Sequence, residues 1–293
     1  MSGGSRGTVM SFVPGGSIQP PMNVSVIVTS HNYGHFLAEA LRSAAEQSCP
    51  AFEIIVVDDG SSDGTSDVAR AHGAKLIRLE GVGAARAKAT GIASCSGDAF
   101  ILLDADDRLA PEYIADTSRA LAASDNIGIV YTAVQLFGDS DRYVRVLPFN
   151  LADLRVGNLI HGASLTRRVA YDQTRGYSAI NLDSHEDWHL FLSIVERGWK
   201  AVAAPNTVLY YRQHGVSRNK TSRLRYRGVV KQIMRDHPEL YGPLPSMWFY
   251  VVWPYAWLAR RAYRYCSRRL GTYSTIEPRG QAMSQLSLPF DAS

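Results

Sequence analysis

Apolar and polar positions follow two alternating periods in the first half of the chain, and this alternation predicts the fold class. Short apolar runs typical of buried strands recur at residues 23–29, 53–59, 75–79 and 99–103. Segments with apolar residues at helical spacing lie between or after these runs, at residues 36–47, 84–94 and 111–123. Strands that alternate with helices form βαβ units. We therefore predict an α/β fold, with a Rossmann-like, mostly parallel sheet flanked by helices.

The second half of the chain has a weaker pattern. Residues 127–137 and 143–147 are expected to form two strands of a hairpin, and residues 159–165 are a candidate for a further strand. Apolar residues at helical spacing predict a helix over residues 187–197.

Composition divides the chain into three parts. Residues 1–21 are rich in Gly, Ser and Pro and lack the apolar core of a signal peptide, which predicts a disordered leader. Residues 22–220 contain the patterned segments and are expected to form one domain. Residues 221–293 are expected to form a helical tail, rich in basic and aromatic residues.

Charge separates the tail from the domain. Residues 218–269 contain twelve basic and two acidic residues, a net charge of +10, in a chain whose formal net charge is +4. The rest of the chain therefore carries −6, and the basic tail is expected to meet an anionic surface, either nucleic acid or a membrane. The three cysteines include no CxxC pair, which suggests neither a disulfide framework nor a zinc site and favours a reducing, cytoplasmic setting.

The uncharged stretch at residues 242–259 favours a membrane over nucleic acid. Its 18 residues include three Trp, two Tyr, one Phe and three Pro, and arginines follow it at positions 260, 261, 264, 268 and 269. A spanning helix needs about 20 predominantly apolar residues, whereas Trp and Tyr prefer the headgroup region. We predict a peripheral membrane contact without nucleic-acid binding. A helix packed on the domain and a spanning helix are the alternatives.

Two groups of carboxylates end two of the predicted strands. Asp58 and Asp59 end the second strand, and Asp104, Asp106 and Asp107 follow the fourth. Ligands bind beyond the carboxyl ends of parallel strands, so both groups are expected at one crevice. Carboxylates suit Mg²⁺ or Mn²⁺ bound with a diphosphate, and they also accept from ribose hydroxyls or base N–H groups. A GxxxxGK[ST] loop and a GxGxxG after the first strand are both missing from the sequence, which does not favour a P-loop NTPase or a nicotinamide enzyme.

Five segments, in order, resemble those of the family 2 (GT-A fold) inverting glycosyltransferases. They read VSVIVTSHN, EIIVVDDGSSDGT, ILLDADDRLAPEYI, SHEDWHLFLSIVERGW and YYRQHGVS, and they span residues 23 to 217. The resemblance implies a GT-A catalytic domain that transfers a hexose, with a divalent metal, from a nucleotide sugar, expected to be a UDP-sugar. The implied acceptor is a hydroxyl of a glycan or a lipid-linked molecule in cell-surface polysaccharide or glycolipid synthesis. From the cysteines and the basic, aromatic tail, we expect a cytoplasmic location at the inner face of the cell membrane.

The resemblance also implies roles for particular residues. It makes Asp187 the catalytic base, which takes a proton from the acceptor hydroxyl as that oxygen attacks the anomeric carbon. Asp106 would ligate the metal, and His214 would be a second metal ligand or a phosphate contact. The implied donor-binding residues are Thr29, Asn32, Asp58, Asp59, Arg86 and Asp104, with Asp59 on the base and Asp104 near the ribose. Lys88 is a further candidate for the donor phosphates, although Ala87 stands where the family usually has Asn.

Other interpretations of these residues stay open at this point. Asp187 taken alone is a typical acid at a helix N-terminus, where the dipole favours negative charge. Trp188 either packs in the core or lines the acceptor site, while His185 and His189 are expected to be structural. The alternative functions are a nucleotidyltransferase and a sugar-nucleotide-binding protein without catalysis.

Overall fold

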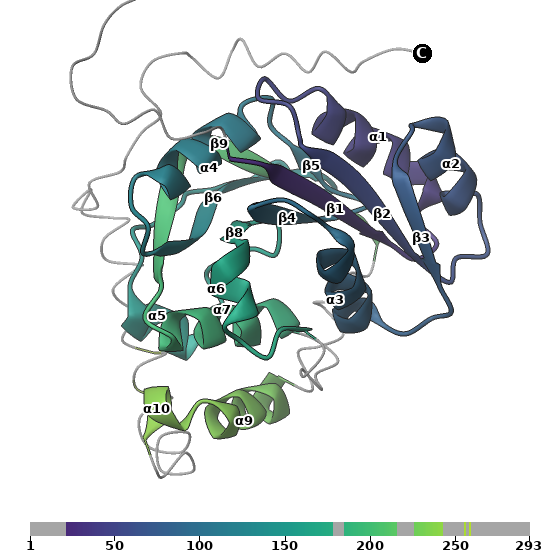
Figure 1. Cartoon of the computed structure of the whole chain (residues 1–293). Helices are drawn as coiled ribbons and strands as arrows, with labels where there is room; N and C mark the ends of the chain where they lie inside the picture. Colours follow the sequence, from purple (N-terminus) through teal and green to yellow (C-terminus); the bar gives the residue numbers. More distant parts are fainter. Residues whose placement is uncertain (1–21, 178–184, 216–225, 243–254, 256–257, 259–293) are drawn as a thin grey trace, which may run out of the picture.

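The computed structural model describes residues 22–177, 185–215, 226–242, 255 and 258. They form one nine-stranded sheet with helices on both faces (Figure 1). The predicted leader and most of the uncharged aromatic stretch lie outside the described residues.

The first four strands are parallel and occur in the order β3-β2-β1-β4. Their bounds are β1 Val24–Ser30, β2 Glu53–Asp59, β3 Lys75–Leu79 and β4 Ala99–Asp104, which confirms the four predicted strands. The helices that connect or follow them are α1 Gly34–Ala45, α2 Thr65–Ala71, α3 Ala84–Ser94 and α4 Tyr113–Ala122. The chain moves outward from β1 to β3 and then returns to the other side of β1, so the strand order switches between β1 and β4.

The second half of the sheet is mixed and continues from β4 in the order β8-β6-β9-β5. The strands are β5 Arg108–Leu109, β6 Ile127–Gly138, β7 Tyr143–Val144, β8 Leu165–Arg167 and β9 Lys200–Gln213. β6 and β9 are parallel, whereas β8 is antiparallel to both β4 and β6. The predicted hairpin is confirmed, because β7 pairs antiparallel with β6.

One predicted strand is largely wrong. Strand β8 begins only at Leu165, and the preceding residues turn: the Ser164 N–H donates to the His161 carbonyl, and the Ile160 N–H donates to the Asn158 side chain. Ile160 and Ala163 are buried, so their apolar character reflects packing of a turn and not the pleat of a strand.

The remaining helices cover one side of the molecule. They are α5 Leu151–Val156, α6 Arg168–Asp172, α7 Glu186–Glu196, α9 Tyr226–Asp236 and α10 Pro238–Tyr241. In Figure 1, α9 and α10 lie beside α5 and α7 at the edge of the domain. Helix α7 confirms the helix predicted over residues 187–197 and begins with Glu186 and Asp187.

Alternation along the strands divides the core into two clusters, one on each face of the sheet. Val26 and Val28 of β1 pack with α1 and α4, whereas Ile27 between them packs with α3 and α7. Successive side chains of a strand point to opposite faces, so a residue's position along its strand fixes which cluster it joins. Gly91 brings α3 close to the sheet, because a Cβ there would lie 2.4 Å from a methyl carbon of Ile27.

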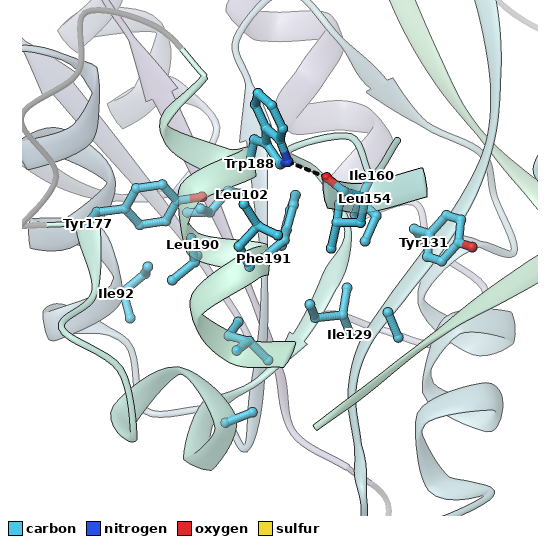
Figure 2. Close-up of a cluster of buried hydrophobic side chains, with 14 of the residues drawn as sticks. Ile92, Leu102, Ile129, Tyr131, Leu154, Ile160, Tyr177, Trp188, Leu190 and Phe191 are labelled. Atoms are coloured by element: carbon cyan, nitrogen blue, oxygen red, sulfur yellow. Dashed lines mark hydrogen bonds between the residues drawn. The ribbon is translucent and has the colours of Figure 1, made fainter. Parts of the chain in front are cut away.

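Helix α7 is anchored by Trp188, which is completely buried. Figure 2 shows its indole N–H donating to the Leu154 carbonyl, at 2.7 Å, within a cluster that also contains Leu190 and Phe191. Trp188 therefore packs in the core, which decides between the two interpretations that the sequence left open.

The described part of the predicted tail, residues 226–242, packs on the same core. Val230, Ile233 and Tyr241 are buried in the cluster that holds Trp188, and the Tyr241 hydroxyl donates to the Arg155 carbonyl. Among the described residues, no helix combines the length and the apolar character that crossing a bilayer would need.

Candidate active site

The candidate site lies where the strand order switches, at the carboxyl ends of β1, β2 and β4. Thr29 of β1 stands beside Asp104 of β4 in the parallel register, and its hydroxyl donates to Asp104 at a long 3.4 Å. Thr29 and Asp104 follow Ile27 and Leu102 by two positions, so they share the sheet face that α3 and α7 cover. Asp59, two residues after Val57, lies on the same face.

Asp58 lies on the opposite face and is fully buried there. It accepts hydrogen bonds from the Ser61 N–H at 2.9 Å and the Ser66 hydroxyl at 2.5 Å, and Arg78 lies 3.2 Å away. Burial opposes ionisation, but the hydrogen bonds from Ser61 and Ser66 hold the pKa of Asp58 below its usual value. These contacts organise the turn between β2 and α2, and a donor contact by Asp58 stays a prediction.

Asn32 joins the loop after β1 to that turn. Its φ of 60° lies in the left-handed region, which Asn tolerates better than most residues. Its backbone N–H donates to the Ser61 hydroxyl, and its side-chain oxygen accepts from the Ser62 N–H, both at 2.9 Å. The side chain is exposed but already fixes two loops together, so its predicted contact with the donor would come in addition to that role.

Asp59 is hydrogen-bonded to the loop before α3. Its two carboxylate oxygens accept from the N–H groups of Val82 and Gly83, at 2.7 and 2.8 Å. Each carboxylate oxygen has two lone pairs, so capacity for a further donor, such as a base N–H, remains. Arg86 lies on the first turn of α3 after this loop, and its side chain is exposed.

The acidic group after β4 is the candidate metal site. Asp104, Asp106 and Asp107 each bring a carboxylate oxygen within 4.8 Å of the others. Burial and the charges of Asp104 and Asp106 raise the pKa of Asp107 well above its usual value, although the Arg212 N–H donates to it at 2.9 Å. The three carboxylates therefore repel one another, and oxygen ligands of this kind fit Mg²⁺ or Mn²⁺.

His214, just after β9, lies next to this acidic group although it is distant in the sequence. Its Nε2 lies 3.0 Å from the Asp106 carboxylate, which is 108 residues earlier in the chain. Its ring also packs against Tyr33 and Phe36 near the start of α1. The predicted pairing of Asp106 and His214 as metal ligands is therefore geometrically possible.

A second layer of contacts holds these loops in place. The Arg212 guanidinium donates to the Asp106 carbonyl at 2.9 Å and to the Glu39 carboxylate at 2.7 Å. Glu39 also lies 3.4 Å from the Arg108 guanidinium, directly after the acidic group. Glu39 thus links α1 to the start of β5 and the end of β9.

The candidate base, Asp187, occupies the first turn of α7. Its Oδ1 accepts from the Lys88 ammonium at 2.8 Å and from the Tyr177 hydroxyl at 2.5 Å. Its Oδ2 lies against Gly162, where a Cβ would come within 2.8 Å. Burial raises the pKa of Asp187, the nearby charge of Glu186 adds to this, and Lys88 opposes it.

Lys88 binds the candidate base and lies within electrostatic reach of Asp104. Its ammonium also donates to Glu186, at 3.0 Å, and the side chain is 3% exposed. Burial alone would lower the pKa of Lys88, but the charges of Asp187, Glu186 and Asp104 outweigh burial and raise it. Sequence reasoning did not find the pairing of Lys88 with Glu186 and Asp187. One signal was available, because Lys88 falls on the inward face of α3, beside Ala87 and Ile92.

The other predicted residues near α7 behave as structural residues. His189 lies 3.2 Å from Asp236 of α9, its ring contacts the ring of His237 in a tilted arrangement, and burial lowers the pKa of His189. His185, immediately before α7, packs its ring near Trp188.

A family profile described as "Glycosyl transferase family 2" matches residues 25–188, more than half of the chain. An uncharacterized glycosyltransferase of Rickettsia felis is 32% identical over 187 residues, which cover 59% of this chain and 31% of that protein. A Bacillus subtilis (strain 168) protein, named as a candidate teichuronic acid biosynthesis glycosyltransferase, TuaG, is 26% identical over 67% of this chain and 82% of its own. The chain thus spans about a third of the Rickettsia relative and most of TuaG.

Solved structures share the fold. S. aureus TarS 1-349 in complex with UDP-GlcNAc has a TM-score of 0.63 at 17% identity, over 75% of this chain and 66% of that one. The mannosyltransferase PcManGT from Pyrobaculum calidifontis, in complex with GDP-Man and Mn²⁺, has a TM-score of 0.59 at 21% identity, over 86% and 77% of the two chains. At these identities the likeness establishes the GT-A architecture.

Proposed function

The chain belongs to glycosyl transferase family 2, and on that premise we propose that it transfers a sugar from a nucleotide-sugar donor to an acceptor hydroxyl, with inversion at the anomeric carbon. The observation that carries the proposal is that Asp104, the first residue of the acidic group, lies on the sheet face covered by α3 and α7, the helices that hold Lys88 and Asp187. Lys88, which binds Asp187, also lies within electrostatic reach of Asp104. A donor bound between the two would therefore present its anomeric carbon near the base.

The donor's nucleotide is proposed to lie over Thr29 and Asp59, with the ribose near Asp104. Asp59 offers carboxylate oxygens that a uracil-like N–H would reach, which favours a UDP-sugar. The neighbours that bind UDP-GlcNAc and GDP-Man support a nucleotide-sugar donor in general terms, without deciding the nucleotide. Arg86, exposed beside this loop, is the proposed contact of the donor phosphates.

Asp106 and His214 are the proposed ligands of Mg²⁺ or Mn²⁺, with Asp104 and Asp107 beside them. The fit rests on charge, because three carboxylates within 4.8 Å repel one another and a divalent cation would relieve that repulsion. Such a cation stabilises the negative charge that grows on a departing diphosphate. The Mn²⁺ of PcManGT supports this assignment.

Asp187 is the proposed general base. Lys88 and Tyr177 both bind Oδ1, so Oδ2, which lies next to Gly162, is the oxygen proposed to accept the proton of the acceptor hydroxyl. A raised pKa brings the carboxylate closer to the optimum for a base near neutral pH, and general base catalysis typically contributes about 10²–10⁴-fold.

The acceptor is proposed to be a glycan or a lipid-linked molecule of cell-surface polysaccharide or glycolipid synthesis, at the inner face of the cytoplasmic membrane. The uncharged aromatic stretch and its flanking arginines support a peripheral contact. Helix α9, just before that stretch, adds Arg227, Lys231 and Arg235, which are spaced four residues apart on one side of the helix. Co-sedimentation with anionic liposomes, comparing the full chain with a 1–242 truncation, tests this contact.

The reaction is tested by incubating the protein with Mn²⁺, UDP-, GDP- and dTDP-sugars and a panel of glycoside and lipid-linked acceptors. Release of the nucleoside diphosphate reports turnover, and NMR of the product reports the anomeric configuration. The proposal expects turnover with one donor class and a product of inverted configuration. A product that retains the donor's configuration would contradict the role given to Asp187.

A further inference from the structure

Lys88 is a buried cation placed between two carboxylates. Its side chain extends from α3, is 3% exposed, and donates to Glu186 Oε1 at 3.0 Å and to Asp187 Oδ1 at 2.8 Å. Removing an ammonium from water costs several kcal/mol unless it is paired with good geometry. The two short contacts supply that pairing, so the position of the Lys88 side chain is tied to the first turn of α7.

The burial of Lys88 argues against a role as a donor contact. Two of its three N–H donors point at carboxylates, and the ring of Tyr177 lies 5.5 Å from its nitrogen. Arg86, two residues earlier on α3, is exposed and is the better placed cation for a diphosphate. The two basic residues of this segment therefore have different surroundings and different tasks.

We propose that Lys88 is a positioning residue of the base: it holds the Asp187 carboxylate in one orientation and keeps it ionised to accept the acceptor's proton. This inference rests on the proposed function, in which Asp187 is the base. Lys88 and the Tyr177 hydroxyl both occupy Oδ1, which turns Oδ2 toward Gly162. Gly162 fits there because any larger residue would come within 2.8 Å of Oδ2. The carboxylate is thus fixed from both sides.

The groups that face Asp187 come from three elements. They are Lys88 of α3, Tyr177 after α6 and Glu186 of α7 itself, while Asp104 of β4 acts on Lys88. Burial and Glu186 raise the pKa of Asp187, and the Lys88 ammonium and the Tyr177 hydroxyl lower it. Without the ammonium, the carboxylate would keep its proton to a higher pH and would not act as a base there.

The test compares Lys88→Met and Lys88→Arg with the wild type, and uses Lys75→Met as the control, since Lys75 is an exposed lysine of β3 that donates to the Ser94 carbonyl. The readout is the pH profile of kcat/KM, measured by nucleoside diphosphate release with saturating Mn²⁺. An opposite charge within hydrogen-bonding distance lowers a carboxylate pKa by about 1–3 units. The acid limb is the low-pH part of this profile, where activity rises as Asp187 loses its proton. Lys88→Met should therefore shift the acid limb to higher pH by about 1–3 units and should lower kcat.

The other readouts separate positioning from donor binding. Lys88→Arg keeps the charge, so its acid limb should lie within a few tenths of a unit of the wild type. The donor KM of Lys88→Met should be unchanged, because the ammonium does not contact the donor. Lys75→Met should match the wild type in the acid limb, kcat and donor KM.

A double variant covers the risk that Lys88→Met does not fold. That substitution leaves Glu186 and Asp187 both buried without their cation, whereas Lys88→Met with Glu186→Gln leaves one carboxylate only. The double variant should melt at a higher temperature than Lys88→Met. Its acid limb should lie between those of Lys88→Met and the wild type, since the charge of Glu186 no longer raises the pKa of Asp187.

The outcomes distinguish this inference from the proposed function. If Asp187→Asn is inactive but Lys88→Met and the double variant keep the wild-type acid limb and kcat, the inference about Lys88 is overturned and the base stands. If Lys88→Met raises the donor KM and leaves the acid limb of the pH profile unchanged, the inference is also overturned, because Lys88 would then be a contact of the donor. If Asp187→Asn is fully active, the proposed base is wrong, and the inference about Lys88 fails with it.

Discussion

The two groups of carboxylates in the candidate site differ in what balances their charge. Glu186 and Asp187 share a cation that the chain itself provides, since Lys88 donates to both. The group of Asp104, Asp106 and Asp107 gathers three carboxylates within 4.8 Å, and burial together with the charges of Asp104 and Asp106 raises the pKa of Asp107.

The difference indicates what each group is for. A carboxylate that is already paired with a buried ammonium keeps a fixed orientation and charge, which suits a group that must accept one proton. Three carboxylates that lie within 4.8 Å of one another are stabilised when a divalent cation arrives, which suits a group that binds a donor diphosphate. Lys88 therefore serves the proposed base, and a bound divalent cation would serve the donor diphosphate.

The largest effect is expected from Asp187→Asn. The amide keeps the shape of the side chain but cannot accept the proton, so nucleoside diphosphate release should fall by about 10²–10⁴-fold. Donor binding should be unchanged, because the acidic group is untouched. Steady-state kinetics with Asp67→Asn as the control, an exposed carboxylate of α2, provides the comparison. Equal losses of activity and donor binding in Asp187→Asn would contradict the separate roles proposed for Asp187 and for the acidic group.

Binding of Mn²⁺ to the acidic group should become tighter as pH rises. The pKa of Asp107 is raised above the ordinary value of 3.8, so a proton competes with the cation until the pH passes that raised value. The thermal stabilisation produced by Mn²⁺ should therefore grow as pH rises from 4 to about 7.5. Differential scanning calorimetry measures it, and stabilisation that shrinks over this range would contradict the assignment.

Asp107→Asn should stabilise the metal-free protein at neutral pH. In the wild type, the metal-free fold loses stability as pH rises from the ordinary carboxyl range through the raised pKa of Asp107. The amide removes that charge, and its oxygen can still accept from the Arg212 N–H. The melting temperature should rise by a few degrees, at about 2–4 °C per kcal/mol. A lower melting temperature, with Asp67→Asn unchanged, would mean that repulsion in the group is unimportant.

The smallest effect is expected from Glu39→Gln. Glu39 links the Arg108 and Arg212 guanidinium groups beside the acidic group, but its side chain is 41% exposed and solvent screens these pairs. Mn²⁺ affinity should fall by a few-fold only. Isothermal titration with Glu46→Gln, an exposed acid at the end of the same helix, is the comparison. A complete loss of Mn²⁺ binding would place Glu39 in the metal site itself.

The parallel half of the fold was predictable from the sequence because its apolar residues follow regular strand and helix spacings. Strands β1 to β4 are short apolar runs, and apolar residues at helical spacing mark α1, α3 and α4. The second half was less predictable: β9 contains Pro205 and Asn206, which are unusual in a strand, and its register with β6 shifts between Thr132 and Ala133. The run at 159–165 was wrongly assigned to a strand because buried turns also contain apolar residues.

The site was predictable to a similar extent. The two acid clusters at the ends of β2 and β4, on either side of β1, were predictable from the sequence, whereas Asp58 was grouped with Asp59 although Asp58 points to the other face. The partner of the base was beyond reach, because Lys88 and Asp187 are 99 residues apart and no local pattern joins them. The nucleotidyltransferase alternative receives no support from the family match.

The central claim, that the acidic group binds a nucleotide sugar with a divalent cation, is tested most directly by thermal stabilisation. Purified protein would be melted with UDP-, GDP- and dTDP-sugars, each with and without Mn²⁺, alongside Asp106→Ala and Asp187→Asn. A ligand at 100 times its dissociation constant adds about 2.7 kcal/mol of stability. Stabilisation by one donor class is expected, which requires Mn²⁺, is lost in Asp106→Ala and persists in Asp187→Asn. Stabilisation that is independent of Mn²⁺ and unchanged in Asp106→Ala would contradict it.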